Sequence, residues 1–164
     1  MYKIGDLTFY KSHGVCRVER IQEESFTGEP KLYYVLQSKL RPGVTLYHPV
    51  ESDNSQLEKI STYSEAMKIL ECFDNKPSNW EDKNTNRQRL HNDTLNRNNH
   101  LEIAQLMNTL LNKEIELQKI DKKLTNQDSH TLQQISVVIY DVLELALKKP
   151  KEELEQEILK KIAN

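Results

Sequence analysis

Residues 28–48 decide the fold of the amino-terminal part of the chain, and they read Gly-Glu-Pro-Lys-Leu-Tyr-Tyr-Val-Leu-Gln-Ser-Lys-Leu-Arg-Pro-Gly-Val-Thr-Leu-Tyr-His. Two runs rich in β-branched and aromatic residues, 31–37 and 44–48, are separated by Arg41-Pro42-Gly43. In a type II turn, proline fixes the first central φ and glycine accepts the positive φ of the second. The stretch therefore predicts two short strands joined by a tight turn.

The sequence before this stretch continues the same pattern. Apolar and polar residues alternate over 7–10 and 14–21, and further turn signals stand at Ser12-His13-Gly14 and Thr27-Gly28-Glu29-Pro30. Four short strands with glycine turns are typical of a small closed barrel. No glycine follows Gly43, so the series of glycine turns ends there. Near residue 60 the alternating pattern of the strands also ends.

Residues 61–164 have a helical period, which predicts a compact domain of four or five helices. Thr62-Tyr-Ser-Glu65 has the form of a capping box, Thr125-Asn-Gln-Asp128 is a second capping signal, and Pro150 is placed to open a final helix. The third helix is expected to run from Leu101 through Ile115 toward Ile120. The predicted fold class is α+β, with a β-barrel module over 1–60 and a helical domain over 61–164.

Composition limits the choice of partners. The chain has 164 residues, a formal net charge of -2 and 29% charged residues, so any attraction for nucleic acid must come from a local patch or from a partner protein. Cys16 and Cys72 stand in different contexts, the start has no apolar signal segment, and no apolar run approaches a membrane span. These features predict a cytoplasmic, reduced protein with no membrane partner.

Trp80, the only tryptophan, lies in a polar stretch instead of on an apolar stripe. A ring beside cations can stack on bases or wedge between them, whereas lone tryptophans also close the edges of cores and domain interfaces. The cations between residues 83 and 97 outnumber the single carboxylate there, Asp93. The candidate DNA-binding residues are Trp80, Lys83, Arg87, Arg89 and Arg97.

No pattern of residues indicates catalysis. The five histidines are scattered, no His or Cys pair has the spacing of metal ligands, and the carboxylates lie in charged surface patterns without a glycine-rich phosphate loop. We therefore expect a protein that is not an enzyme and that has no cofactor, metal or small-molecule substrate.

In its order of motifs the chain resembles the CarD-like family of bacterial transcription regulators, and the resemblance runs over nearly its whole length. The matching motifs of the first module are Ile4-Gly-Asp6, Tyr10-Lys-Ser-His-Gly-Val15, Ile21, Gly28-Glu-Pro-Lys-Leu-Tyr-Tyr-Val-Leu36 and Thr45-Leu-Tyr-His-Pro49. Those of the second domain are Asn79-Trp80, Arg87-Gln-Arg89, Glu102-Ile-Ala-Gln-Leu-Met107 and Leu124-Thr125.

The resemblance implies a Tudor-like or SH3-like module that binds the β subunit of RNA polymerase, and a helical domain that meets promoter DNA at the upstream edge of the melted bubble. It implies that Trp80 wedges at this junction without reading a sequence, which stabilises the open complex and gives the protein a nucleoid association through the polymerase. The implied polymerase-binding residues are Glu24, Thr45, Leu46, Tyr47 and His48.

The chain departs from the family pattern at several of these places. Glu24 and Tyr47 stand where some relatives carry arginines, so pairing of backbone groups at an exposed strand edge is expected in place of the same ion pairs. The tryptophan-to-arginine spacing is a few residues longer than is usual. The helix after Leu124-Thr125 starts without the lysine that in relatives approaches DNA, so this contact is expected to be either absent or made by Lys122 or Lys123.

Two other kinds of function stay open. The β module also looks like the polymerase-interacting domain of transcription-repair coupling factors, which predicts a protein-only adaptor whose tryptophan packs between domains. A third hypothesis is a small barrel that binds RNA. Such a barrel needs a basic strand surface with aromatic residues, and the glutamates mixed into the strands argue against one here.

Overall fold

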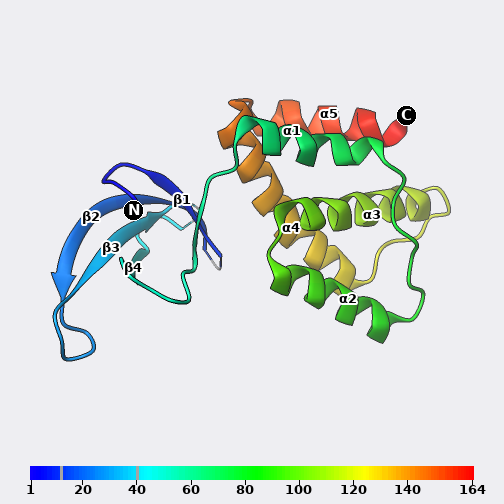
Figure 1. The fold of residues 1–164 in the computed structure, drawn as a ribbon. Coiled ribbons are helices and arrows are strands. Elements are labelled where there is room, and N and C mark those ends of the chain that lie inside the picture. The colour runs from blue at the N-terminus through cyan, green and yellow to red at the C-terminus, as the bar shows by residue number, and fades with distance from the viewer. Residues whose placement is uncertain (12, 40) are drawn as a thin grey trace. The chain divides into compact units, whose positions relative to one another are not determined.

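The computed structural model describes residues 1–11, 13–39 and 41–164 (Figure 1). The chain divides into two compact units, Met1–Ile60 and Ser61–Asn164. The first is built from strands and the second from helices, so the fold class is α+β as predicted. Ser12, which the sequence placed in a turn, lies outside the described residues.

The β unit is a five-stranded antiparallel sheet with the strand order β4-β3-β2-β1-β5. Its strands are β1 (Leu7–Tyr10), β2 (Gly14–Glu24), β3 (Lys31–Ser38), β4 (Thr45–Pro49) and β5 (Leu57–Lys59). A meander of four strands whose fifth strand returns to pair with the first is the connectivity of Tudor and SH3-like modules. The sequence analysis predicted four of these strands but missed β5, because three residues are too short to show an alternating pattern.

The turn between β3 and β4 has the predicted geometry. Gly43 has a φ of +89°, and the N–H of Val44 donates to the carbonyl of Arg41 over 3.1 Å. This φ is strained for any residue with a Cβ, so glycine is required at the second central position. The turn brings β4 antiparallel to β3 with Val35 opposite Tyr47.

One face of the sheet carries a buried apolar cluster. A register shift between Val18 and Arg20 marks an irregularity in the long strand β2, where a bulge bends a strand and increases its twist. The buried cluster on this face comprises Cys16, Val18, Tyr34, Leu36 and Leu57. Leu57 comes from β5, so the strand that the sequence missed supplies part of the core.

The helical unit has the predicted caps. Its elements are α1 (Tyr63–Glu71), the 3-10 turn η1 (Cys72–Asp74), α2 (Asn84–Arg97), α3 (His100–Gln118), α4 (Asn126–Leu147) and α5 (Lys151–Ala163). Thr62 and Glu65 form the reciprocal capping box, Thr125 accepts from the N–H of Asp128, and Pro150 occupies the cap position of α5. The third helix ends at Gln118 and does not reach Ile120, whose side chain is exposed.

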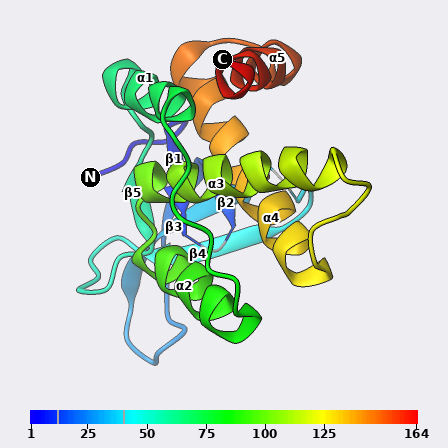
Figure 2. The ribbon, with the colours of Figure 1, turned by 90° about the vertical axis from the view of Figure 1, so that its right-hand side faces the viewer.

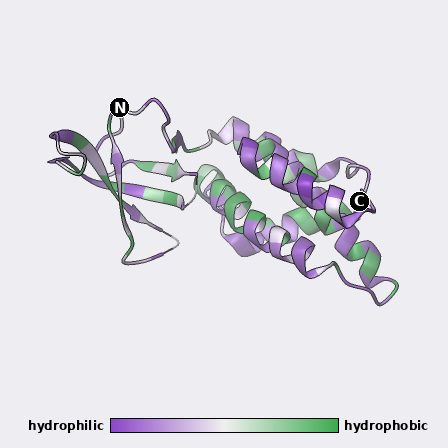
Figure 3. Cartoon of the chain, turned by 90° about the horizontal axis from the view of Figure 1, so that it is seen from below, coloured by the Kyte–Doolittle hydropathy of each residue, from purple (hydrophilic) through white to green (hydrophobic). Residues whose placement is uncertain are grey.

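Helices α3 and α4 form the centre of this unit. Each contacts α1, α2 and the other, and α4 also contacts α5 (Figure 2). Purple and green alternate along the helices in Figure 3, as expected for amphipathic helices that bury one stripe. The buried apolar side chains include Ala66, Ile69, Leu70, Phe73, Ile103, Ala104, Met107, Leu110, Leu132, Ile135, Ile139, Val142, Leu143, Leu147, Leu154 and Ile158.

This packing predicts the effect of truncating α4 on its buried side. Leu143 has no exposed surface, so Leu143→Ala is expected to lower the free energy of unfolding by about 2–5 kcal/mol through lost burial and the cavity left behind. Val137→Ala on the same helix is the control, because that side chain is 41% exposed; it should change stability by about 0.5 kcal/mol or less. Urea unfolding followed by the fluorescence of Trp80 measures both, and equal effects would contradict this packing.

Candidate functional site

Trp80 lies on the irregular segment that joins η1 to α2, at residues 75–83. Its side chain is half-buried. Cations from two different helices approach the ring: the guanidinium carbon of Arg87 in α2 is 4.7 Å from the ring centroid, and Nζ of Lys113 in α3 is 5.3 Å from it. The tryptophan is therefore neither fully in the core nor free on the surface.

Helix α3 holds the first part of this segment through its polar side chains. The amide of Asn108, which is buried, donates to the carbonyls of Cys72 and Asn75 over 3.4 and 3.1 Å. The N–H of Ser78 donates to the hydroxyl of Thr109 over 3.1 Å. The bonds to Asn75 and Ser78 satisfy backbone groups of the irregular segment, so the segment runs along α3 in a defined path.

Arg87 holds the second part of the segment. Its Nη1 donates to the carbonyls of Glu81 and Asp82, the two residues after the tryptophan, over 3.0 and 3.3 Å. Its Nε lies 3.1 Å from both carboxylate oxygens of Asp128 in α4, and its Nη2 lies 2.8 Å from Oδ2. Both side chains of this ion pair are more than nine-tenths buried.

The environment keeps Asp128 ionised. Burial by itself raises the pKa of this carboxyl, but the hydrogen bonds that it accepts from Arg87, Thr125 and Gln88, with the positive charge of Arg87, hold its pKa below the ordinary value. The hydroxyl of Thr125 donates over 2.8 Å and the amide of Gln88 over 2.7 Å. The charge of Arg87 is therefore neutralised inside the protein.

His91 lies one turn after Arg87 and is also buried. Burial lowers the pKa of its imidazole, the nearby negative charge of Asp128 opposes this, and the charge of Arg87 adds to it, with a net lowering. The ring is therefore neutral near pH 7, and the 3.6 Å between its Nδ1 and Oδ1 of Asp128 is a polar contact without the strength of an ion pair.

The other candidate DNA-binding residues have different surroundings. Lys83 and Arg89 are exposed, and Lys83 occupies the cap position of α2. Arg97 pairs with Glu102 over 2.8 Å and also donates to Thr94. The structure thus brings Trp80 and Arg87 together, leaves Lys83 and Arg89 open to solvent, and places Arg97 in a surface ion pair.

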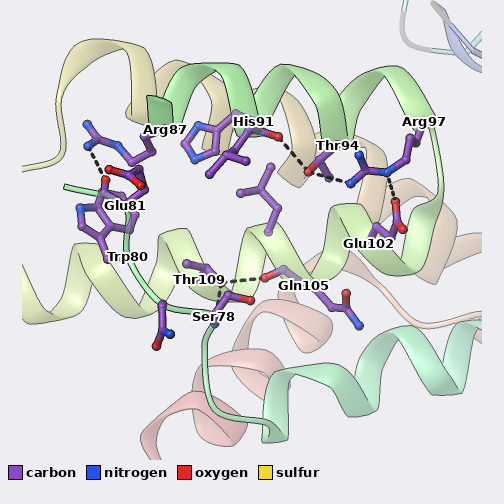
Figure 4. A pocket seen from close by; sticks show the side chains of 13 residues that line it. Ser78, Trp80, Glu81, Arg87, His91, Thr94, Arg97, Glu102, Gln105 and Thr109 are labelled. Carbon is purple, nitrogen blue, oxygen red and sulfur yellow. Dashed lines mark hydrogen bonds and ion pairs between the residues drawn. The ribbon is translucent and has the colours of Figure 1, made fainter. Parts of the chain in front are cut away.

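A groove of about 240 Å³ runs between α2 and α3 beside the tryptophan (Figure 4). Trp80, Glu81 and Arg87 lie together at one end, and Arg97 and Glu102 lie at the other. Leu90 and Leu106 are among its lining residues.

In the β unit, the candidate polymerase-binding residues lie on an edge strand. Strand β4 pairs with β3 and, among the described strands, with no other. The N–H of Val50 donates to the carbonyl of Leu32, and the N–H of Ser38 donates to that of Val44. Because bonded pairs alternate in an antiparallel ladder, the backbone groups of Thr45 and Tyr47 face away from the sheet.

The side chains of β4 alternate as well. Those of Thr45 and Tyr47 are exposed, Leu46 packs against the core, and His48 is buried. The N–H of Gln56 donates to Nε2 of His48 over 3.2 Å, so the ring proton is on Nδ1, which donates to the carbonyl of Pro49 over 2.8 Å. His48 therefore ties β4 to the segment before β5 and has no nitrogen left for a partner.

Glu24 ends β2, is half-buried, and accepts a hydrogen bond from the amide of Gln22. Near it the structure shows a residue that the sequence did not single out. Phe26 is 61% exposed and makes edge contacts with Tyr33 and Tyr47, at centroid distances of 5.1 and 5.2 Å. Its position in a turn carried no signal, because only the fold brings it to the side of β4.

The chain thus combines a small antiparallel module that has a free strand edge with a helical unit that holds a half-buried tryptophan. Residues 2–64 match the family model of the CarD-like/TRCF RID domain. This part of the chain is similar to that domain family, whose role is interaction with RNA polymerase and is not enzymatic. No curated protein matches the sequence.

Among the described residues, no group of His, Cys, Asp and Glu side chains is arranged to hold a metal ion. Within the same residues, no helix has the length and apolar character that crossing a membrane requires.

The lowered pKa of His91 predicts a pH dependence of stability. The unfolded chain binds a proton at His91 more readily than the folded chain does. The contribution of His91 to the free energy of unfolding is therefore fully present above the ordinary histidine pKa of about 6.5, and it falls as the pH drops below that value. His91→Gln cannot titrate and should lose less stability between about pH 7.5 and 5.5. Urea unfolding at a series of pH values compares the two proteins, and parallel losses would mean that His91 titrates normally in the folded state.

Proposed function

We propose that the chain is a transcription regulator that binds the β subunit of RNA polymerase through its β unit and stabilises the promoter open complex through its helical unit. The observation that carries this proposal is the match of residues 2–64 to the CarD-like/TRCF RID domain. The partner surfaces are then the free edge of β4 on one unit and the surroundings of Trp80 on the other.

Binding to the polymerase proceeds by addition of a partner strand to β4. The outward backbone groups of Thr45 and Tyr47 supply the hydrogen bonds, and this mode of recognition tolerates changes of side chain at the edge. The exposed rings of Phe26 and Tyr47 lie beside this edge and add apolar contact. Glu24, Leu46 and His48 support the edge from within or beside the sheet.

Contact with DNA is sequence-independent and comes from Trp80 and the exposed cations near it. A ring placed where base stacking is already lost stabilises the end of the duplex without reading a base. Lys83 and Arg89 are exposed and remain available to phosphates, whereas Asp128 neutralises Arg87 and Glu102 pairs with Arg97. So few free cations give weak binding, which anchoring to the polymerase compensates by raising the local concentration.

A protein-only adaptor on the polymerase is the second candidate function. The observation that favours it is the contact of Trp80 with Arg87 and Lys113, because these contacts also suit a ring that only packs its own segment. This candidate shares the β edge and predicts no effect of Trp80 on promoter DNA.

The lifetime of open complexes distinguishes the two candidates. Trp80→Ala is expected to shorten the lifetime on a defined promoter by roughly 5- to 150-fold, since an aromatic contact with a base contributes about 1–3 kcal/mol. Trp80→Phe keeps a ring and should lose less. The decay is measured with cognate polymerase after addition of a competitor, and an unchanged lifetime of Trp80→Ala with intact polymerase binding would favour the protein-only adaptor.

The strand-addition mode predicts a specific effect of proline in β4. Thr45→Pro removes an N–H that points away from the sheet, where an edge strand tolerates proline, so the fold should persist while affinity for the polymerase β subunit falls about tenfold or more. Thr45→Val keeps the N–H and should bind normally. Titration of the isolated β subunit measures both variants; equal affinities for them would exclude pairing through this edge.

A further inference from the structure

The geometry around Arg87 points to a role for Asp128 that neither the sequence motifs nor the domain family assigns. We propose that Asp128 acts through Arg87 as a positioning pair, which fixes the indole of Trp80 in place before it meets a partner. The pair comes from α4 and α2, and the tryptophan precedes α2 on its own segment. The importance of this for DNA rests on the proposed function, but the positioning itself is a property of the free protein.

The hydrogen bonds of Arg87 leave only one part of its guanidinium for the tryptophan. Nε and Nη2 face the carboxylate of Asp128, Nη2 also donates to Oδ1 of Asn84 over 2.8 Å, and Nη1 faces the carbonyls of Glu81 and Asp82. The N–H donors of a guanidinium all lie in its plane and are engaged here, so only its face is left.

That face carries the tryptophan. The guanidinium carbon of Arg87 lies 4.7 Å from the indole centroid, at the distance of a cation–π contact. The same guanidinium holds the backbone of the two residues that follow Trp80. The ring and its main chain are therefore fixed by one planar group, and a lysine at position 87 has no flat fork with which to do both.

Asp128 is itself held on several sides. It receives hydrogen bonds from Thr125 and Gln88 besides those from Arg87, and it lies in the first turn of α4, where the helix dipole favours a negative charge. These contacts fix the orientation of the carboxylate, and the carboxylate in turn fixes the orientation of the Arg87 guanidinium. The Asp128–Arg87 pair in this way connects the first turn of the central helix α4 to a segment that has no regular secondary structure.

If the orientation of the Trp80 side chain is fixed before binding, the side chain loses less conformational entropy when it binds a partner. The segment of Trp80 has no helix or sheet bonds of its own, so its order depends on side chains from α2 and α3. Removal of the Asp128–Arg87 pair leaves the α3 bonds to Asn75 and Ser78 intact but releases the part of the segment that carries the ring. The positioning pair thus acts on the tryptophan and not on the path of the whole segment.

The chain contains a single tryptophan, so its fluorescence reports this site alone. Arg87→Gln, Asp128→Asn and the double variant should each raise the quenching of Trp80 by acrylamide about two- to fourfold, since a released ring meets the quencher more often. Because Asp128 acts through Arg87, the double variant should show no more quenching than either single one. The far-UV circular dichroism of every variant shows whether the helices remain.

Lys149→Gln and Glu157→Gln supply the matched control. They break another ion pair of the same unit, with a distance of 3.2 Å between Nζ and Oε2, and should leave the quenching of Trp80 unchanged. If Asp128→Asn does not fold, Arg87→Lys tests the positioning role instead. This variant keeps a positive charge beside Asp128 but lacks the planar guanidinium. It should raise the quenching as much as Arg87→Gln does.

Unchanged quenching in folded Arg87→Gln or Arg87→Lys, or additive effects of the two single changes, would overturn the positioning role. Open-complex lifetime is the second readout: Arg87→Lys should shorten it roughly three- to tenfold, from the cost of ordering one side chain on binding. Raised quenching in a protein whose Trp80→Ala variant has a normal lifetime would leave the positioning intact and contradict the proposed function alone.

Discussion

The buried pair of Arg87 and Asp128 is the interaction on which the helical unit depends for its second helix. Helix α2 has a poor apolar face, and its buried side chains are Arg87 and His91. A helix that buries so little apolar surface needs polar contacts to fix its place. A buried ion pair adds little net stability compared with an apolar pair, but loss of one partner costs about 3–5 kcal/mol because the other charge is left alone. The intact pair therefore joins α2 to α4 and fixes the orientation of Arg87, while it adds little net stability to the unit.

Much of the fold was predictable because its signals are local. Alternating strands, the turn at Pro42-Gly43 and the capping residues Thr62 and Thr125 depend on neighbours within a few positions, and the structure confirms them. Strand β5 was missed because its three residues pair with β1, which lies far back in the sequence. Short elements of this kind take their conformation from a partner.

The candidate site was predictable only in part, for the same reason. A count of charges around Trp80 treats each arginine as open to solvent, yet Arg87 is paired with a carboxylate 41 positions away. Phe26 reaches Tyr47 only through the pairing of β3 with both of its neighbours. No pattern along the sequence records these contacts. The roles of the named residues in binding DNA and polymerase stay predictions.

The free edge of β4 ends in Pro49, which has no N–H. The edge therefore offers a foreign strand only two outward donors, those of Thr45 and Tyr47, before the ladder stops. Open edges are a common route to association between copies of a protein, since any extended chain can continue the sheet. The edge of β4 forms too few hydrogen bonds to hold two copies together by itself. A strand that makes no contacts besides these hydrogen bonds binds only weakly. If the proposed strand addition is correct, a partner strand must therefore also pack against the neighbouring rings of Phe26 and Tyr47.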